Sequence, residues 1–440
     1  MATLRKEIDI SYNKLQLKTQ NKLKSFRKIH CLNETYSLRD DKVYFERAKD
    51  TYIYDYDGNK YLDFSMGAGT TLFGHASPII LDNVKDILDN GTIFTSPNMK
   101  AHELAEKLNK ILYLDDFIFC NSGAESTSRA MRIARAYTNR NKIAIFSGGW
   151  HGGHDYGLVD DNYDIGDNSI VTPILKSQGI PPEILDTMIL LPYNDKKAFE
   201  IIDKNKNDIA AVFIEPSQGS NPRDDMKEFL VELRGVTKKS NILLCFDEII
   251  TGFRIAKGGA QEYYDIDIDM ATYAKTIGGG FPFGIIAGKH DIMKTIKEKS
   301  IFMGGTFSAN PISITSSLSV VNYLLKNDIY ENLNNNAKFL KESINNYCIE
   351  NNISLRISNF GSMFRFIFTD KFIRSRKDRD KYEIPYEIQN VFYKDLLNNG
   401  IYIGSNRINF ISTMHTKKIL EQFIEKVIAT ITKLQKDKLI

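Results

Sequence analysis

Short apolar runs alternate along much of the chain, from about residue 80 to 325, with longer stretches whose apolar residues recur at helical spacing. Several of these runs are almost wholly apolar, which is typical of strands covered on both faces of a parallel sheet. The runs are Asp116 to Cys120, Lys142 to Phe146, Ala210 to Ile214 and Ile242 to Phe246. This alternation predicts an α/β fold with a large, mostly parallel sheet.

The two ends of the chain show other patterns. The first 30 or so residues are basic and weakly amphipathic, and they predict an N-terminal helix. Residues 52–64 (YIYDYDGNKYLDF) alternate apolar and polar side chains around Asp57 and Gly58, which predicts a hairpin. Towards the C-terminus, apolar residues recur at helical spacing up to Leu434 behind Thr416, a plausible N-cap. That apolar stripe indicates a helix packed on a core.

These patterns divide the chain into three parts. We expect an N-terminal segment at 1–60 that packs with a small domain, a large α/β domain at 61–329, and a small α+β domain at 330–440. A chain of 440 residues is long enough for more than one domain. Its hydrophobic share of 42% and charged share of 26% are those of ordinary globular proteins, which argues against disordered and fibrous classes.

Charge, apolar run length and cysteine spacing limit the partners and the cell compartment that we expect. A formal net charge of +3 is too small to indicate binding to nucleic acid or to an anionic membrane, so we expect neither partner. No apolar run approaches the roughly 18 residues of a membrane span, and the charges between Arg5 and Asp9 interrupt any signal-peptide core. The widely spaced cysteines, Cys31, Cys120, Cys245 and Cys348, favour reduced thiols in a cytoplasmic protein.

Residues that can bind a ligand or take part in catalysis follow the predicted strands. In open α/β sheets, ligands bind beyond the carboxyl ends of the strands. After the first strand, residues 121–126 (NSGAES) form a small-residue turn that leads into a helix. Such a turn is either a phosphate cradle or simply a capped helix start. Asp247 and Glu248 follow a fully apolar strand, where an unpaired carboxylate would be costly. A partner is therefore implied, such as a protonated heterocycle nitrogen.

Three further residues follow strands or tight turns. Lys275 precedes three glycines and is either a buried amine suited to Schiff-base chemistry or a solvated surface lysine. Trp150 is the only tryptophan, and it either stacks on a flat cofactor or fills a core or rim position. His151 and His154 have a spacing compatible with a metal, but no third ligand is evident, so we predict no metal site.

Together and in this order, the motifs resemble those of the class III aminotransferases of pyridoxal 5′-phosphate (PLP) fold type I, most closely the glutamate-1-semialdehyde 2,1-aminomutase family. The resemblance runs from about Tyr52 to Thr416. Its most specific pieces are NSGAES, GWHGGHD, FIEPSQG, CFDEIITGFR, YAKTIGGG and GGTFSANP. It implies an enzyme whose cofactor is PLP, bound in the large domain, with a small-molecule amino donor and a carbonyl acceptor.

The resemblance also implies residue roles. Lys275 matches the lysine that forms a Schiff base with PLP, and Asp247 matches the acid that pairs with its ring nitrogen, so these two are the expected catalytic residues. Thr306 matches a threonine that reaches the phosphate of the neighbouring subunit, which implies a homodimer with shared active sites. The remaining cofactor-binding positions that it implies are Ser122, Gly123, Ala124, Trp150, His151, Glu215 and Gln218.

The chain departs from the aminomutase pattern at two places. The aminomutases carry an asparagine shortly after the Glu-Pro motif, where this chain has Ser220; Gln218 matches instead the form found in other class III transaminases. Near the C-terminus, Arg407 stands where the aminomutases have a glutamate. An arginine there suits a substrate carboxylate or phosphate, although a surface charge is the alternative. Arg39 matches loosely the N-terminal arginine that binds the substrate carboxylate in aminomutases.

The sequence therefore favours an intermolecular aminotransferase that acts on an acidic or phosphorylated carbonyl compound. The alternative is the aminomutase reaction, in which the amino group moves within one molecule. A third possibility, a binding protein that has lost its activity, is disfavoured by the intact Lys275 and Asp247.

Overall fold

The computed structural model describes residues 2–25, 43–163, 171–404 and 407–440. The chain forms two compact units, a larger one of residues 78–330 and 373–381 and a smaller one made by the remaining residues. These boundaries differ from the expected ones. Residues 61–77 belong to the smaller unit, because strand β3 (Lys60–Asp63) pairs within the sheet of that unit.

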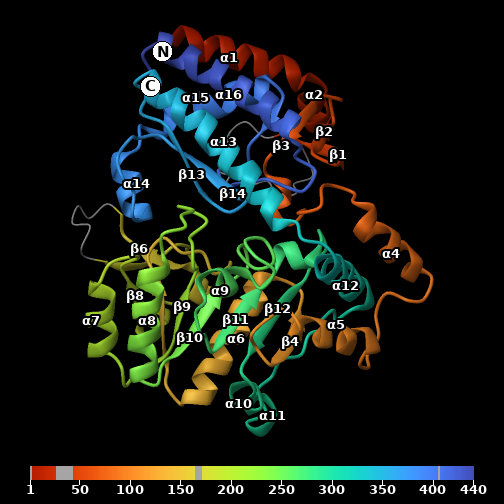
Figure 1. Ribbon diagram of the computed structural model, residues 1–440, viewed down its shortest axis with the longest axis vertical. Coiled ribbons are helices and arrows are strands. Elements are labelled where there is room, and N and C mark those ends of the chain that lie inside the picture. Colours follow the sequence, from red (N-terminus) through yellow and green to blue (C-terminus); the bar gives the residue numbers. More distant parts are fainter. Residues whose placement is uncertain (1, 26–42, 164–170, 405–406) are drawn as a thin grey trace. The chain divides into compact units, whose positions relative to one another are not determined.

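The larger unit is built on a seven-stranded sheet in the order β4-β12-β11-β10-β9-β5-β8 (Figure 1). Only β12 runs antiparallel to its neighbours, so the predicted mostly parallel sheet is confirmed. Every residue of β9 and β10 is buried, which explains why both strands are apolar except for Asp247, the last residue of β10. The strands are β4 (Asp116–Cys120), β5 (Lys142–Phe146), β8 (Met188–Leu191), β9 (Ile209–Ile214), β10 (Leu243–Asp247), β11 (Met270–Tyr273) and β12 (Gly284–Gly288).

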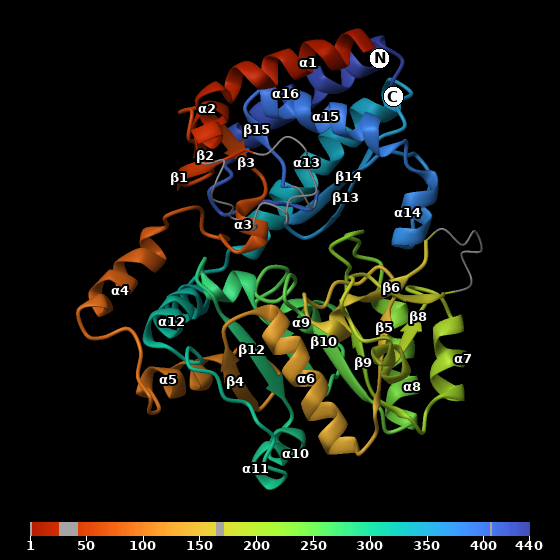
Figure 2. The same ribbon diagram turned by 180° about the vertical axis from the view of Figure 1, so that it is seen from behind.

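Helices cover both faces of this sheet. Figure 1 shows α7 and α8 on one face, and Figure 2 shows α6 on the other. The buried face of α6 packs Met131 and Ile133 against strand residues such as Ile143 and Phe213. The helices of this unit are α4 (Pro78–Leu88), α5 (Met99–Asn109), α6 (Gly123–Thr138), α7 (Lys197–Lys204), α8 (Lys227–Lys239), α9 (Gly259–Tyr264), α10 (His290–Met293), α11 (Thr295–Glu298), α12 (Pro311–Lys326) and α14 (Arg376–Tyr382). A small hairpin, β6 (Val159–Asp161) and β7 (Pro173–Leu175), completes the unit.

The smaller unit contains two sheets, β1-β2-β3-β15 and β13-β14-β16. The predicted hairpin is present as β2 and β3, and the predicted C-terminal helix is α16, whose N-cap Thr416 accepts a hydrogen bond from the Ile419 N–H. Its strands are β1 (Phe45–Lys49), β2 (Tyr52–Asp55), β3, β13 (Arg356–Phe360), β14 (Met363–Ile367), β15 (Ile401–Tyr402) and β16 (Asn409–Phe410). Its helices are α1 (Ala2–Leu15), α2 (Leu17–Ser25), α3 (Met66–Gly69), α13 (Tyr330–Glu350), α15 (Tyr386–Asn398) and α16 (Lys417–Lys436).

The N-terminal helices are part of the smaller unit. Asn398 of α15 donates to the Ile8 carbonyl at 2.9 Å, and Lys394 forms an ion pair with Asp9.

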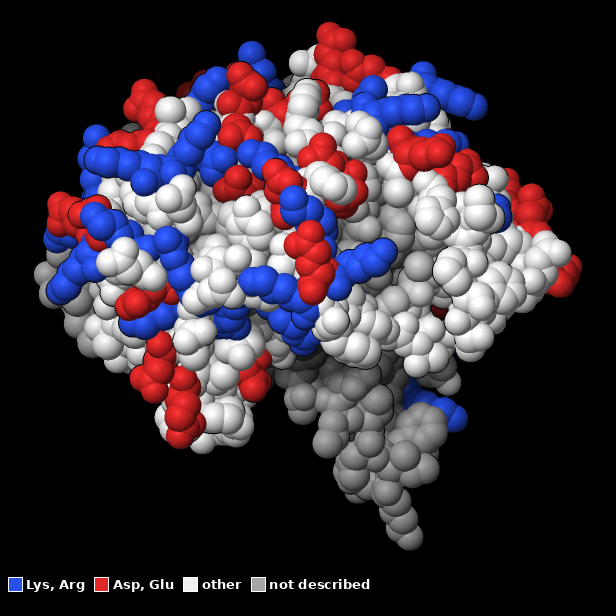
Figure 3. Space-filling model, turned by 90° about the horizontal axis from the view of Figure 1, so that it is seen from below, with Lys and Arg blue, Asp and Glu red and all other residues white. Residues whose placement is uncertain are grey.

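Among the residues described, no helix has the length and apolarity needed to cross a membrane. Lys and Arg are interspersed with Asp and Glu on the face shown in Figure 3, part of which carries few charged side chains.

One buried carboxylate ties the N-terminal helices to the hairpin. Asp55, only 1% exposed, accepts hydrogen bonds from Gln16 Nε2 at 2.8 Å, Tyr61 Oη at 2.7 Å and the Asn59 N–H at 2.8 Å. We expect Asp55→Ala to lower the free energy of unfolding by about 3 kcal/mol, because Gln16 and Tyr61 lose their acceptor while remaining buried. The measurement is the urea midpoint. Asp82→Ala, whose side chain is 69% exposed, is the control, and equal midpoints for the two variants would contradict the assignment.

Candidate active site

A buried carboxylate and imidazole meet at the end of the central strand β10. Asp247 Oδ2 lies 2.7 Å from His151 Nδ1, and both side chains are 1% exposed. Asp247 Oδ1 accepts from the Ile249 N–H at 3.1 Å and from Thr272 Oγ1 at 3.4 Å. Burial lowers the pKa of His151, but the hydrogen bond and charge of Asp247 raise that pKa above its ordinary value. Sequence reasoning implied a partner for Asp247 without identifying His151 or Thr272.

Two polar atoms of the predicted cofactor-binding residues are buried without a partner. His151 Nε2 has no hydrogen bond, and neither does Gln218 Oε1, although Gln218 Nε2 donates to the Ser147 carbonyl at 2.8 Å. A buried polar atom left unpaired costs about 1–3 kcal/mol, so such atoms call for a partner. The pair of unsatisfied atoms therefore fits a ligand with polar groups of its own.

Glu215 follows β9 and lies in the same group. Its carboxylate accepts hydrogen bonds from the Trp150 N–H at 2.7 Å and the Gly219 N–H at 3.1 Å. Burial, and secondly the charge of Asp247, raise the pKa of Glu215 to about 7. The backbone of Trp150 is thus held in place, while its side chain is 56% exposed, which excludes a core role for the indole.

Lys275 begins the turn that follows β11. Its φ of +50° lies in the left-handed region, which costs a residue with a Cβ about 1–2 kcal/mol. Strain of this kind concentrates at functional sites. Burial lowers the pKa of Lys275 to about 8, against the opposing charges of Glu215 and Asp247. A fraction of the amine is therefore neutral near neutral pH and able to act as a nucleophile.

The predicted phosphate turn forms the start of α6. Ser122 is the N-cap, and its side chain accepts a hydrogen bond from the Glu125 N–H at 3.2 Å. The N–H groups of Gly123 and Ala124 belong to the first turn, where a helix supplies no acceptor of its own. A Cβ at Gly123 would lie 2.7 Å from Ile249 Cδ1, so a side chain at this position would require Ile249 to shift. The turn has the form of an anion-binding helix terminus.

The other predicted residues are on other elements of the chain. Thr306 is exposed, in the connection between α11 and α12. Arg407, in the smaller unit, is only 7% exposed; it donates to Gln389 Oε1 at 2.5 Å and to Asn390 Oδ1 at 2.6 Å. Its guanidinium lies 3.9 Å from the ring centre of Tyr386. These contacts exclude the interpretation of Arg407 as a surface charge. Arg39 lies outside the described residues.

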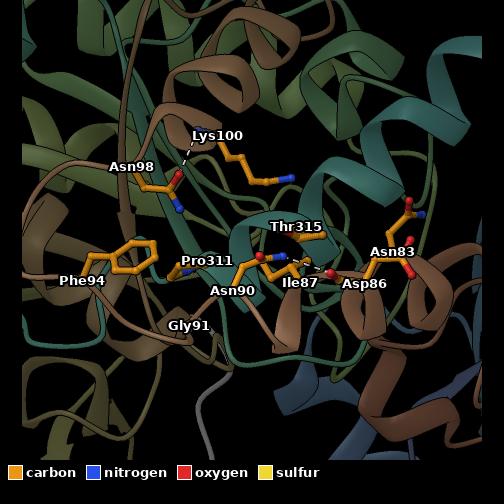
Figure 4. Close-up of a pocket in the computed structure, with 10 residues that line it drawn as sticks. All are labelled: Asn83, Asp86, Ile87, Asn90, Gly91, Phe94, Asn98, Lys100, Pro311 and Thr315. Carbon is orange, nitrogen blue, oxygen red and sulfur yellow. Dashed lines mark hydrogen bonds between the residues drawn. The ribbon is translucent and has the colours of Figure 1, made fainter.

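The larger unit also holds a cavity of about 370 Å³ among α4, α5 and the start of α12 (Figure 4). It is lined by Asn83, Asp86, Ile87, Asn90, Gly91, Phe94, Asn98, Lys100, Pro311 and Thr315. No residue predicted to bind the cofactor or substrate is among them. The chemistry inferred from the sequence therefore gathers at the strand ends around Asp247 and Lys275, not in this cavity.

Comparison with known proteins bears on this site. A family model described as aminotransferase class-III matches residues 35–434. A glutamate-1-semialdehyde 2,1-aminomutase of Methanococcus maripaludis is 36% identical over 400 residues, covering 89% of this chain and 91% of that protein. The corresponding protein of Methanocaldococcus jannaschii is 35% identical over 396 residues, covering 87% and 89%.

Solved structures extend the comparison. An omega-transaminase from Sphaerobacter thermophilus has a TM-score of 0.84 at 27% identity, covering 91% of this chain and 93% of that one. A glutamate-1-semialdehyde aminomutase from Pseudomonas aeruginosa has a TM-score of 0.88 at 18% identity over 98% of both chains, a likeness of fold. One neighbour is a transaminase with PLP bound. The chain therefore belongs to the class III aminotransferases, enzymes that depend on pyridoxal 5′-phosphate.

Proposed function

We propose that this protein transfers an amino group to an acidic or phosphorylated carbonyl substrate, with Lys275 as the covalent anchor of PLP. The observation that carries the proposal is a buried lysine in a strained turn, whose pKa is lowered by burial against the charges of Glu215 and Asp247. The unsatisfied His151 Nε2 and Gln218 Oε1 fit a cofactor that brings polar groups of its own. Bound PLP supplies an electron sink for the carbon that loses a proton.

Residues of this chain would bind PLP, orient it and transfer a proton. Asp247, held by His151 and two further donors, provides a fixed negative charge that favours a protonated ring nitrogen. The first turn of α6, behind Ser122, binds the phosphate and keeps the ring in register. Lys275 would take up and return the proton that the substrate carbon loses, a contribution of about 10²–10⁴-fold in rate.

The proposal includes a homodimer with shared sites. The connection that carries Thr306 exposes two large apolar side chains, Phe302 at 75% and Phe307 at 64%. Met99 and Phe94, also in the larger unit, are 79% and 51% exposed. Exposed apolar groups of this size favour a covering partner, and a second copy would bring Thr306 to the phosphate of its neighbour.

A second candidate is the aminomutase reaction. The curated relatives described above carry the aminomutase name at 35–36% identity over most of the chain, which favours it. Ser220 and Arg407, at positions where the aminomutase pattern has asparagine and glutamate, favour the intermolecular reaction instead. Arg407 would place a positive charge where the aminomutase pattern has the negative charge of a glutamate. A positive charge suits an acidic substrate better than a diamine.

A half-reaction separates the two candidates. Purified enzyme loaded with PLP is mixed with single amino donors, including L-glutamate and L-alanine. We expect one donor to convert the bound cofactor to its pyridoxamine form and to release a stoichiometric keto acid. The measurement is the loss of visible absorbance together with assay of the keto product. Turnover of glutamate-1-semialdehyde to 5-aminolevulinate, without conversion by any donor, would establish the aminomutase reaction.

The lowered pKa of Lys275 predicts a pH dependence for cofactor attachment. Only the neutral amine attacks the aldehyde, so the rate at which apoenzyme forms its visible chromophore with PLP should rise with pH and level off above about 8. An unperturbed lysine would continue to gain until about pH 10.4. The check is a stopped-flow pH series. Lys275→Ala should form no chromophore at any pH, and a chromophore in that variant would contradict the assignment.

Variants of Arg407 and Arg39 test whether the substrate carries an acidic group. If Arg407 holds its acidic group, Arg407→Ala should raise KM for acidic substrates about tenfold or more, because a charged hydrogen bond is lost, and leave the Kd for PLP unchanged. Arg39→Ala gives the comparison at the other predicted position. A variant that loses stability with KM unchanged would show that Arg407 serves only its contacts with Gln389 and Asn390.

A further inference from the structure

We propose that Glu125 and Arg129 are positioning residues that connect the phosphate turn of one subunit to the loop that serves the site of the other. The inference rests on the proposed function, because it takes PLP and a second copy of the chain as given. It goes further by assigning a role to two residues that contact neither cofactor nor substrate.

The connection is a chain of hydrogen bonds along one side of α6. The Asn121 N–H, at the start of the phosphate turn, donates to Glu125 Oε2 at 2.7 Å. Glu125 Oε1 forms an ion pair with Arg129 Nη2, one helical turn further on. The same Nη2 donates to the carbonyl of Gly304 at 2.8 Å. The phosphate turn and residue 304 are thus joined through two side chains.

The loop is held at its base and exposed at its tip. Arg132, also on α6, donates to the Phe302 carbonyl at 2.7 Å. A Cβ at Gly305 would lie 3.1 Å from Arg129 Nη2, so the backbone approaches the guanidinium closely. The next two residues, Thr306 and Phe307, are exposed. The arginines therefore hold the backbone of residues 302 and 304, next to the exposed Thr306.

The ion pair between Glu125 and Arg129 is largely shielded from solvent, so its loss should have a measurable effect. The Arg129 side chain is 8% exposed and that of Glu125 is 26% exposed. Removing one partner of a sheltered pair leaves the other charge uncompensated. A cavity of about 400 Å³ borders the pair, lined by Ala124, Glu125, Ser128, Arg129, Arg132, Gly153, His154, Phe302 and Gly304. A second copy of the chain is the occupant consistent with an outward-directed Thr306.

The geometry predicts an effect that crosses the dimer. When Arg129 is lost, the phosphate turn of the same subunit keeps its N-cap Ser122 and its N–H groups. The loop at residue 304 loses its hydrogen bond, and with it the placement of Thr306. The weakened cofactor site is therefore the one in the partner, although the partner has an unaltered sequence.

Mixed dimers separate the two sites. One subunit carries Lys275→Ala, so that only the other can attach PLP covalently, and two affinity tags isolate the mixed species. With Arg129→Gln on the Lys275→Ala subunit, we expect PLP to leave the intact subunit about tenfold faster, as for one lost charged hydrogen bond. With Arg129→Gln on the Lys275-bearing subunit, the release rate should stay close to that of the unaltered mixed dimer.

Binding is followed without turnover. PLP release is read from the visible absorbance, and PLP uptake by apoenzyme from quenching of Trp150, the only tryptophan. Thr306→Val on the Lys275→Ala subunit should reproduce the effect, and the double variant should add little, because both remove one contact. Arg135→Gln is the matched control, since Arg135 lies on α6 and donates to the Asn141 carbonyl at 2.8 Å. Glu125→Gln substitutes for Arg129→Gln if the latter does not fold.

The outcomes are distinct. Faster release only when Arg129→Gln lies in the PLP-bearing subunit, or no change in either arrangement, would overturn the inference. An effect of Thr306→Val without one of Arg129→Gln would also overturn it, while leaving the shared site in place. If unaltered protein takes up no PLP, or forms no dimer, the proposed function itself fails.

Discussion

The carboxyl group of Asp247 is buried, with 1% of its side chain exposed, and much of the site is arranged to give it hydrogen-bond partners. A carboxylate buried without partners would take up a proton or destabilise the fold. Here His151 lies 2.7 Å away, and the Ile249 N–H and Thr272 hydroxyl supply further donors. Burial is the largest influence on the pKa values of Glu215 and Lys275, and the Asp247 carboxylate raises both of them.

The sheet makes this arrangement possible. Strands β9, β10 and β11 are neighbours and parallel, so their carboxyl ends meet at one edge. Asp247 is the last residue of β10, and Glu215 and Lys275 follow β9 and β11 within two residues, so each is brought to that edge from a different part of the chain. The loop after β5 adds Trp150 and His151. A ligand bound there contacts residues that are far apart in the sequence.

The fold matches both transaminases and aminomutases. The proposed choice between the two reactions therefore depends on single positions, Ser220 and Arg407. Arg407 is enclosed by Gln389, Asn390 and Tyr386 within the smaller unit. One fold supports several reactions, so the fold does not indicate the substrate. The evidence for the substrate has to come from positions such as Ser220 and Arg407.

The sequence by itself determined the features that depend on near neighbours. The strands β4 and β5, the capped start of α6 behind Ser122 and the helix behind Thr416 were all predicted, since periodicity and capping involve residues a few positions apart. The order of the motifs also indicated the family. The tertiary structure alone decided which side chains meet. His151 and Asp247 are 96 positions apart, and residues 61–77 and 373–381 joined units other than those expected. Such pairings depend on strand order and on packing between distant segments, which local patterns do not encode.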